Sequence, residues 1–372
     1  MYYPTGMKQF ITISLEVISI RCIDNPEFWG SSMGSIWFNP EVLGDSLSET
    51  AGYKSGLALS IEEMCDHLVD TGYSDLLRAS ETQVVRLRSE DYDELFYKLL
   101  HRIGYTKEEF NGDITGIGLF HKYHGTEFEH IHAGVQQIFI EVWPKLIEAA
   151  IARDTRTLDP TLFIRTAHKK HGMKGAELAL ERIQVIDEGM RLNPNSGLRY
   201  TEWKSVEALE GLFKGGSGKI EAGKFLDQRF VNYLIANHDR LSDMHWRKFE
   251  ELTAEYFHQQ GFSVELGPGS NDDGIDVRVW KSNQNEESDP PHIIIQCKRQ
   301  KAKVEKVIVK GLHADMQHFN AELGLLVTTS ELSPGAKETI IARGYAINEV
   351  DNTGLKGWLK ALEKPGSGIV RI

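Results

Sequence analysis

The stretch from Asn271 to Arg299 decides the fold: it reads N-D-D-G-I-D-V-R-V-W (271–280), then a polar loop, then I-I-I-Q-C-K-R (293–299). Short apolar runs rich in Val and Ile, bounded by turn-forming residues, are typical of strands. Asp276 stands on the first predicted strand, and Gln296 and Lys298 close the second one, 20 positions further on. This spacing predicts a hairpin with a flexible tip that brings an acid, an amide and a lysine onto neighbouring strands.

Length and composition indicate a globular protein of two domains. The 372 residues are 41% hydrophobic and 26% charged, which argues against overall disorder. We see neither an apolar run of the ~18–20 residues that span a bilayer nor a secretory signal at the N-terminus. The three cysteines, an odd number without a C-x-x-C pair, do not suggest a disulfide framework. We therefore expect a cytoplasmic protein with no membrane partner.

The segment from Lys298 to Lys310 is positively charged in an otherwise acidic chain. The whole chain has a formal net charge of −12, yet residues 298–310 hold six Lys and Arg against the single acid Glu305. The field at a site decides binding more than net charge does, so this run predicts contacts to nucleic-acid phosphates. The alternative, a solvated helix face, stays open. The predicted nucleic-acid-binding residues are Arg299, Lys301, Lys303, Lys306 and Lys310.

Three regions are predicted along the chain. Residues 1–214 read as an α+β domain, because an alternating strand pattern at 10–20 is followed by helical patterns at 91–103, 128–152 and 174–190. A capping box at Ser60 to Glu63 begins a further helix, which Gly72 is expected to end. Residues 215–223 read as a glycine-rich linker. Residues 224–372 form the third region.

The third region predicts an α/β layer with a mixed sheet. Its periodicities give, in order, helices at 225–236 and 245–260, strands at 262–266, 275–280 and 293–297, a helix at 304–320, a strand at 324–328, a helix at 334–343, a strand at 346–350 and a closing helix at 353–362.

Five short motifs in this region resemble those of the Mrr-type restriction endonuclease domain, a branch of the PD-(D/E)xK nuclease superfamily. They occur in the order of the family pattern, and together they are far more specific than any one alone. The resemblance covers the C-terminal third and says nothing about the first ~210 residues. The motifs are F-E-E-L (249–252), G-F-S-V (261–264), D-D-G-I-D (272–276), Q-C-K (296–298) and L-V-T-T-S (326–330).

The resemblance implies a restriction-endonuclease-like fold and a metal-dependent phosphodiesterase site. Hard divalent cations that prefer oxygen ligands suit such hydrolysis, so we expect Mg²⁺, with Mn²⁺ as a substitute. Lys298 would orient or help deprotonate the attacking water. The implied catalytic residues are Glu250, Asp276, Gln296 and Lys298, and the implied metal ligands are Asp276, Glu250, Gln296 and the backbone carbonyl of Cys297.

Several positions near the site allow a second interpretation. Glu251 adjoins Glu250, and the apolar stripe of the helix does not decide between them. Asp273 stands where the family often has glycine, and Asp272 suits a loop cap as well as a metal site. The Cys297 side chain is better interpreted as a small buried hydrophobe than as a nucleophile. His313 and Gln317 are expected to be surface residues.

The N-terminal region has no recognised motif. The spacing of His121, His124, His130 and His132 does not keep one helix face, so solvated histidines are expected rather than a zinc site. Trp29, Trp37 and Phe38 suit the core of a small sheet better than a pocket for a flipped base. By analogy with the Mrr group, we expect this region to select the target or to bind a regulatory ligand or partner protein.

These observations predict a Mg²⁺-dependent endonuclease that cleaves double-stranded DNA in bacterial defence and acts as a homo-oligomer. Two alternatives remain: a nucleic-acid binding or sensing protein whose nuclease fold no longer cuts, and a resolvase specific for branched DNA. Metal-independent binding without nicking would favour the first alternative. Cleavage of branched but not linear duplexes would favour the second.

Overall fold

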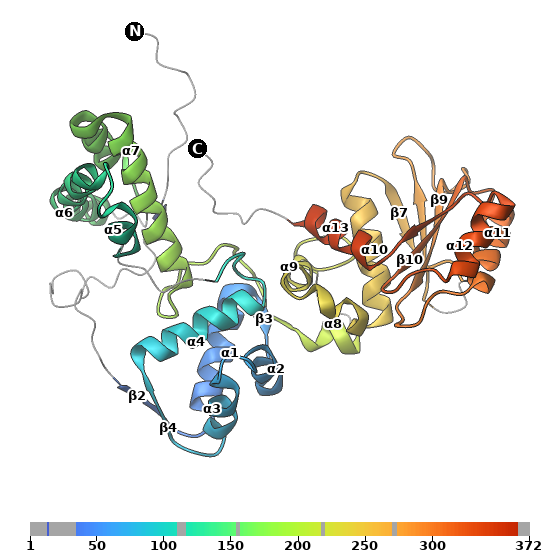
Figure 1. The fold of residues 1–372 in the computed structure, drawn as a ribbon, viewed down its shortest axis with the longest axis horizontal. Helices are drawn as coiled ribbons and strands as arrows, with labels where there is room; N and C mark the ends of the chain where they lie inside the picture. Colours follow the sequence, from blue (N-terminus) through green and yellow to red (C-terminus); the bar gives the residue numbers. More distant parts are fainter. Residues whose placement is uncertain are drawn as a thin grey trace, which may run out of the picture.

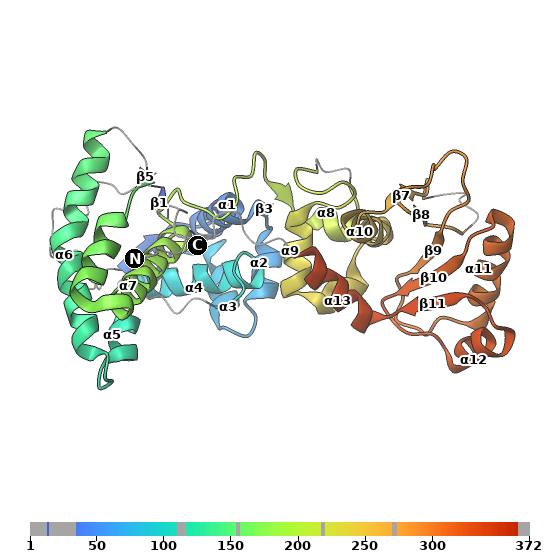
Figure 2. The same ribbon diagram turned by 90° about the horizontal axis from the view of Figure 1, so that it is seen from above.

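The computed structural model describes residues 35–109, 117–153, 157–216, 220–269 and 274–363, together with the backbone of Ile13–Ser14. Figures 1 and 2 both place a helical N-terminal part at one end of the molecule and a sheet flanked by helices at the other. The predicted α/β fold of the C-terminal part is confirmed. The expected strand at 10–20 lies outside the described residues except for β1 (Ile13–Ser14).

The described N-terminal part is mainly helical. Its short strands form three two-stranded sheets: β1 with β5 (Thr157–Leu158), β2 (Ser35–Phe38) with β4 (Val85–Arg88), and β3 (Leu57–Ala58) with β6 (Glu207–Ala208). Its helices are α1 (Val42–Ser55), α2 (Ile61–His67), α3 (Tyr73–Ser80), α4 (Ser89–Arg102), α5 (Ile117–Tyr123), α6 (Glu129–Ala152), α7 (Thr161–Leu192) and α8 (Glu210–Lys214).

The predicted capping box of this part is confirmed, whereas the predicted limits of two helices are wrong. Ser60 and Glu63 form both hydrogen bonds of the predicted capping box at the start of α2. Gly72, however, does not end that helix: its left-handed conformation, with φ 79°, precedes α3 instead. The helix expected at 174–190 begins earlier, at Thr161, because two helical segments meet across a break at Gly172.

Of the aromatic residues Trp29, Trp37 and Phe38, the last two are described, and they have different environments. Phe38 is buried and stacks on Tyr92, with 5.6 Å between the ring centroids, so it belongs to the core. Trp37 is 66% exposed and lies beneath the Arg86 guanidinium. Trp29 lies outside the described residues. The two therefore do not share a buried pocket.

The C-terminal part contains one five-stranded sheet in the order β11-β10-β9-β8-β7. The neighbours β7, β8 and β9 pair antiparallel, whereas β9, β10 and β11 pair parallel, which gives the mixed sheet predicted from the sequence. The strands are β7 (Ser263–Leu266), β8 (Val277–Trp280), β9 (Ile293–Lys298), β10 (Leu323–Thr328) and β11 (Ile347–Val350).

Helices cover both faces of this sheet (Figure 1). Along β9, Ile293, Ile295 and Cys297 belong to the apolar cluster shared with α10, while Ile294, which lies between the first two, belongs to the cluster shared with α11. This alternation is the period of two that a strand covered on both faces requires. The helices are α9 (Gln228–Ala236), α10 (Trp246–Gln259), α11 (Lys306–Phe319), α12 (Pro334–Arg343) and α13 (Asn352–Leu362), with a 3-10 helix at His238–Asp243.

Helix α9 begins three residues later than the periodicity predicts, because two carboxylates bind the preceding backbone. Glu255 accepts hydrogen bonds from the backbone N–H groups of Lys224, Phe225 and Leu226. Burial raises the pKa of its carboxyl, but a hydrogen bond from Gln259 and these backbone bonds outweigh burial and lower it. Asp227 then accepts from the N–H of Arg229 as the helix N-cap. The chain therefore becomes helical only after Asp227.

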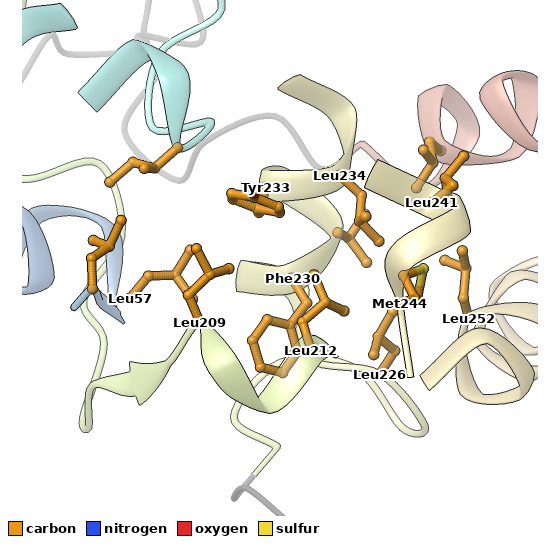
Figure 3. Packing of buried hydrophobic residues seen from close by; sticks show 14 of the residues in the cluster. Leu57, Leu209, Leu212, Leu226, Phe230, Tyr233, Leu234, Leu241, Met244 and Leu252 are labelled. Carbon is orange, nitrogen blue, oxygen red and sulfur yellow. The ribbon is translucent and has the colours of Figure 1, made fainter. Parts of the chain in front are cut away.

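One hydrophobic cluster joins the N-terminal part to the sheet layer. Figure 3 shows Leu57 and Leu209 beside Phe230 and Tyr233, with Leu252 of α10 at the far side of the same cluster. A buried Arg229 crosses the same boundary: it binds Asp227 at 2.7 Å and donates to the carbonyl of Ser205 at 2.8 Å. The domain limits at 214 and 224 stay a prediction, and the described residues around them share a core.

The boundary contains a pH-sensitive residue. His67 is buried against Tyr233, and burial followed by the charge of Arg240 lowers its pKa to about 4. In the unfolded chain, the His67 imidazole takes up a proton near pH 6.5. The stability that neutral His67 contributes to the folded state is therefore present above that pH and is lost as the pH falls toward 4. We expect the contribution of His67 to the free energy of unfolding to drop by about 2 kcal/mol between pH 7 and pH 5.

Denaturant unfolding at pH 7 and pH 5 measures this drop. The pH dependence of the free energy of unfolding should differ between His67→Leu and the wild type by this amount, whereas a change at the exposed His121 (His121→Gln) should leave the wild-type pH dependence. An equal pH dependence in the wild type and His67→Leu would contradict the prediction.

Candidate active site

Three elements position the predicted site residues at one end of β8 and β9. Glu250 comes from α10, Asp276 directly precedes β8, and Gln296 and Lys298 close β9. The N–H of Asp276 donates to the carbonyl of Ile295 at 3.0 Å, so the end of β9 lies directly beside Asp276. The hairpin predicted from the spacing is confirmed by the antiparallel register of Val277 with Ile295.

The Asp276 carboxylate occupies the end of the ladder between the two strands. Its Oδ2 accepts a hydrogen bond from the N–H of Cys297 at 2.6 Å, and the residue is 8% exposed. Its carbonyl accepts from the N–H of Gly267 at 2.8 Å. Backbone contacts from two sides therefore hold Asp276 in place, and such support is what a precisely positioned ligand needs.

Glu250 reaches the same point from the helix and is 6% exposed. Burial raises the pKa of its carboxyl to about 7, and the negative charge of Asp276 and a hydrogen bond with Asp276 act in the same direction. Arg247 opposes this shift with an ion pair of 3.0 Å and also donates to the carbonyl of Gly267 at 2.7 Å. Two adjacent buried carboxylates repel each other when both are ionised, so the pair favours a proton or a cation.

The helix also distinguishes Glu250 from its neighbour. Glu251 forms an ion pair with Lys248 at 2.8 Å, and its side chain is 16% exposed. It makes no described contact with Asp276. Of the two glutamates, Glu250 is therefore the one that the fold brings to Asp276.

Gln296 presents an unpartnered oxygen. Its Oε1 is buried and has no hydrogen-bond partner among the described residues. A Cβ added at Gly274 would lie 3.1 Å from Gln296 Nε2, and Gly274 has a φ of 82°. Glycine at this position therefore lets the chain before Asp276 turn close to Gln296. An orphaned buried acceptor is costly, and binding a cation would satisfy it.

Lys298 ends β9 on the same face as Gln296, because side chains alternate along a strand. Its backbone is anchored, since its carbonyl accepts from the Thr328 hydroxyl at 2.8 Å. The side chain is half-buried and makes no hydrogen bond or ion pair in the described part of the chain. Its ammonium group is thus available to a ligand.

The Cys297 thiol is structural. It contacts the Thr253 hydroxyl at 3.5 Å, and burial, together with the charge of Asp276, holds the pKa of the thiol well above its usual range. A thiol kept neutral in this way is no nucleophile. Its carbonyl, by the alternation of the antiparallel ladder, faces the β8 side beside Asp276.

The oxygen donors at this point fit a hard divalent cation. They comprise the carboxylates of Glu250 and Asp276, the unpartnered Gln296 Oε1 and the Cys297 carbonyl, all ligand types that Mg²⁺ accepts. Within the described ranges, His, Cys, Asp and Glu side chains alone do not form a group of three suited to a metal. The neighbouring Asp272 and Asp273 lie outside the described residues.

The basic run beyond Lys298 divides into two groups. Arg299 donates to the carbonyl of Ser242 at 3.0 Å, and Lys303 pairs with Glu331 at 2.7 Å. Lys301, Lys306 and Lys310 are exposed and form no ion pair in the described ranges. These last three have free ammonium groups on the surface after β9 and along α11.

Two further predicted surface residues lie on α11. Gln317 is exposed as expected, whereas His313 is half-buried and stacks on Tyr345 with 3.7 Å between the centroids. His313 therefore packs between α11 and the segment before β11, and the expectation of a surface residue is wrong for it.

Sequence reasoning missed Arg247, the cation that contacts Glu250. A signal was present, because Arg247 stands three positions before Glu250, the spacing at which helical side chains meet. Thr253 beneath Cys297 and Thr328 beside Lys298 were also missed. Their contacts depend on which strands are neighbours, so the linear sequence contains no comparable signal for them.

The N-terminal histidines do not form a metal site in the part of the chain that the structure describes. His124 pairs with Glu129 at 2.7 Å, and His132 stacks on Tyr123 with 5.5 Å between the centroids. His121 and His130 are exposed.

Comparisons with known proteins found a family model and a solved structure that are similar to parts of this chain. Residues 241–359 match the family model of the restriction endonuclease domain Mrr_cat. A solved structure of the MspJI restriction endonuclease in complex with a 27-mer oligonucleotide is similar at 16% sequence identity, with a TM-score of 0.28, over 51% of this chain and 42% of that chain. The chain thus aligns with less than half the length of that protein. The search of curated proteins found no match.

The family match confirms the resemblance inferred from the five motifs. The C-terminal third is a restriction-endonuclease-like domain of the Mrr type, and nuclease is the class of protein that this domain indicates. Residues 1–240 lie outside the match. Among the described helices, none has both the length and the apolar character needed to cross a membrane.

Proposed function

We propose that this chain is a Mg²⁺-dependent endonuclease that hydrolyses phosphodiester bonds of double-stranded DNA, with Mn²⁺ as a substitute. The observation that carries the proposal is the contact between the buried carboxyl groups of Glu250 and Asp276 beside the unpartnered oxygen of Gln296. Paired carboxylates in a nuclease-like domain are more simply explained as cation ligands than as structural groups, because their mutual repulsion destabilises the empty site.

The residues have separate roles in this proposal. Glu250, Asp276, Gln296 and the Cys297 carbonyl would hold the cation, which would supply Lewis-acid stabilisation of the charge on the phosphoryl group. The Lys298 ammonium orients the attacking water and stabilises the charge that develops on the phosphate oxygens. Arg247 is a positioning residue, because it holds Glu250 through their ion pair.

DNA contacts are proposed for the basic run after β9. Lys301, Lys306 and Lys310 have no ion-pair partner in the described ranges, so their charges are available to phosphates. Arg299 and Lys303 contribute to the same positive surface from their anchored positions.

A role in defence against foreign DNA, a cytoplasmic location and self-association belong to the same proposal. Cutting both strands of a duplex requires two active sites or two successive events, and a symmetric homo-oligomer supplies two sites. Residues 1–214 are proposed to select the target or regulate the nuclease.

A pair of adjacent glutamates tests the proposal. Glu250→Gln removes one negative charge from the carboxyl pair, so we expect at least about a 100-fold loss of cleavage. Glu251→Gln is the matched control, since Glu251 pairs with Lys248 away from the site. Rates are measured on supercoiled plasmid at saturating Mg²⁺. If both variants cleave at the wild-type rate, or if both are equally impaired, Glu250 has no specific role in catalysis.

A further inference from the structure

A second positively charged surface lies on α7, in a part of the chain outside the family match. The first segment of this helix, residues 161–171, is amphipathic. Phe163 and Ala167 face a hydrophobic core formed with α5 and α6, where Phe163 makes an edge contact with Trp143 at 6.0 Å between the centroids. The opposite side of the segment is exposed to solvent.

That exposed side is basic. Arg165, Lys169 and Lys170 are all exposed, and no Asp or Glu occurs between Asp159 and Glu177 in a chain that contains 54 acidic residues. Arg165 and Lys169 stand four positions apart, where like charges on a helix repel each other. This arrangement therefore lowers helix stability slightly, and an external anion would relieve the repulsion. We call these three residues the α7 basic segment.

The two glutamates that follow the segment on α7, Glu177 and Glu181, have other partners. Glu177 forms an ion pair with Lys174, and Glu181 accepts a hydrogen bond from the Tyr123 hydroxyl at 2.6 Å and pairs with Lys122. None of the residues of the α7 basic segment forms an ion pair within the described ranges. Their positive charge is thus not neutralised locally, whereas that of the neighbouring lysines is.

Close backbone packing holds the segment in position. The helix breaks at Gly172, where φ is 67°. A Cβ at Gly134 of α6 would lie 2.3 Å from the His171 ring, and one at Gly175 would lie 2.5 Å from the carbonyl of Ala167. These glycines allow α6 and both segments of α7 to approach closely, so the basic side chains project from a well-packed element.

We propose that Arg165, Lys169 and Lys170 bind the phosphate backbone of duplex DNA, as a second contact besides the run after β9. The inference rests on the proposed nuclease function, which supplies the polyanion to which this charge is complementary. Figures 1 and 2 place α7 and α11 at opposite ends of the molecule. Changes in the α7 basic segment therefore leave the residues around the candidate active site untouched.

The test measures DNA binding by the full chain in EDTA, by fluorescence anisotropy with a linear duplex over a series of salt concentrations. The variant Arg165→Gln/Lys169→Gln/Lys170→Gln removes three positive charges. Loss of three phosphate contacts should weaken binding about 10-fold or more at 150 mM salt and reduce the slope of log K against log salt by about 2 to 3. A variant that keeps the charges, Arg165→Lys/Lys169→Arg/Lys170→Arg, should bind like the wild type.

The matched control is Lys337→Gln/Lys356→Gln/Lys360→Gln, which removes the same charge from exposed positions on α12 and α13. Equal affinity and slope in the two charge-removing variants would overturn the inference. So would unchanged DNA binding combined with lost binding to poly-glutamate, which would make the partner an acidic protein. If the wild type cleaves plasmid but the α7 variant binds DNA normally, only this inference fails. A wild type that neither binds nor cleaves DNA overturns the proposed function as well.

Discussion

Asp276→Ala is expected to abolish DNA cleavage, with a loss of about 10³-fold or more. The carboxylate contacts Glu250 and caps the N–H of Cys297 at the same time, so it joins the helix to the strand pair at the proposed metal position. Without this carboxylate, one proposed metal ligand is missing, and Glu250 and Cys297 no longer have the side chain that they both contact. Mg²⁺-dependent nicking of supercoiled plasmid measures the loss.

Asp276→Asn separates chemistry from folding in this experiment. The amide oxygen can still accept from the Cys297 N–H, so the strand end should persist while the negative charge is absent. We expect a folded protein with the same thermal transition as the wild type and cleavage as low as that of Asp276→Ala. Wild-type cleavage by either variant would contradict the proposed role of Asp276.

Lys298→Ala is expected to reduce turnover by about 10²- to 10⁴-fold while DNA binding remains within a few-fold of the wild type. The ammonium group makes no hydrogen bond or ion pair in the described part of the chain, so little stability depends on it. DNA binding should persist because Lys301, Lys306 and Lys310 still provide the positive surface. Single-turnover cleavage and duplex binding by anisotropy measure the two quantities separately.

Comparing the loss of cleavage rate with the loss of duplex binding distinguishes a catalytic lysine from a lysine that only contacts phosphate. If Lys298→Ala weakens duplex binding as much as it lowers the cleavage rate, Lys298 acts by binding DNA rather than by promoting the chemistry. Lys306→Ala, a change of the same kind within the basic run, is the control and should affect binding more than turnover.

Much of the C-terminal fold was predictable from the sequence, because its elements are short and strongly patterned. The run Ile293–Lys298 is apolar and β-branched with a polar end, so both its strand conformation and its burial follow from local signals. Helix α12 begins at Pro334 after the N-cap Ser333 and ends before Gly344, as its capping residues predict. In both elements, the local sequence favours the same conformation as the packing of the folded protein.

The N-terminal part was less predictable, since long-range packing decides its limits. The break of α7 at Gly172 lies next to His171, whose ring approaches Gly134 of α6 closely, and this approach has no local signature. The shared core around Leu57, Leu209 and Phe230 likewise joins residues far apart in sequence. A glycine-rich composition near 215–223 does not reveal such packing.

The candidate site was less predictable than the C-terminal fold and more predictable than the N-terminal part. The five motifs identified Glu250, Asp276, Gln296 and Lys298, and the antiparallel pairing of β8 with β9 explains why Asp276 lies beside Cys297. Helical periodicity did not decide between Glu250 and Glu251; the family motif favoured Glu250, and in the structure Glu250 is the one that contacts Asp276. The ion pair of Arg247 with Glu250 was not predicted, although the spacing of three positions on a helix is a signal for it.

The central claim is that this chain cuts DNA with a divalent cation bound at Glu250 and Asp276. The most direct measurement incubates the wild type and Asp276→Asn with supercoiled plasmid in Mg²⁺, in Mn²⁺ and in EDTA. The account predicts nicked or linear plasmid only for the wild type and only with a cation. Cleavage by the wild type in EDTA, or by Asp276→Asn in Mg²⁺, would contradict it.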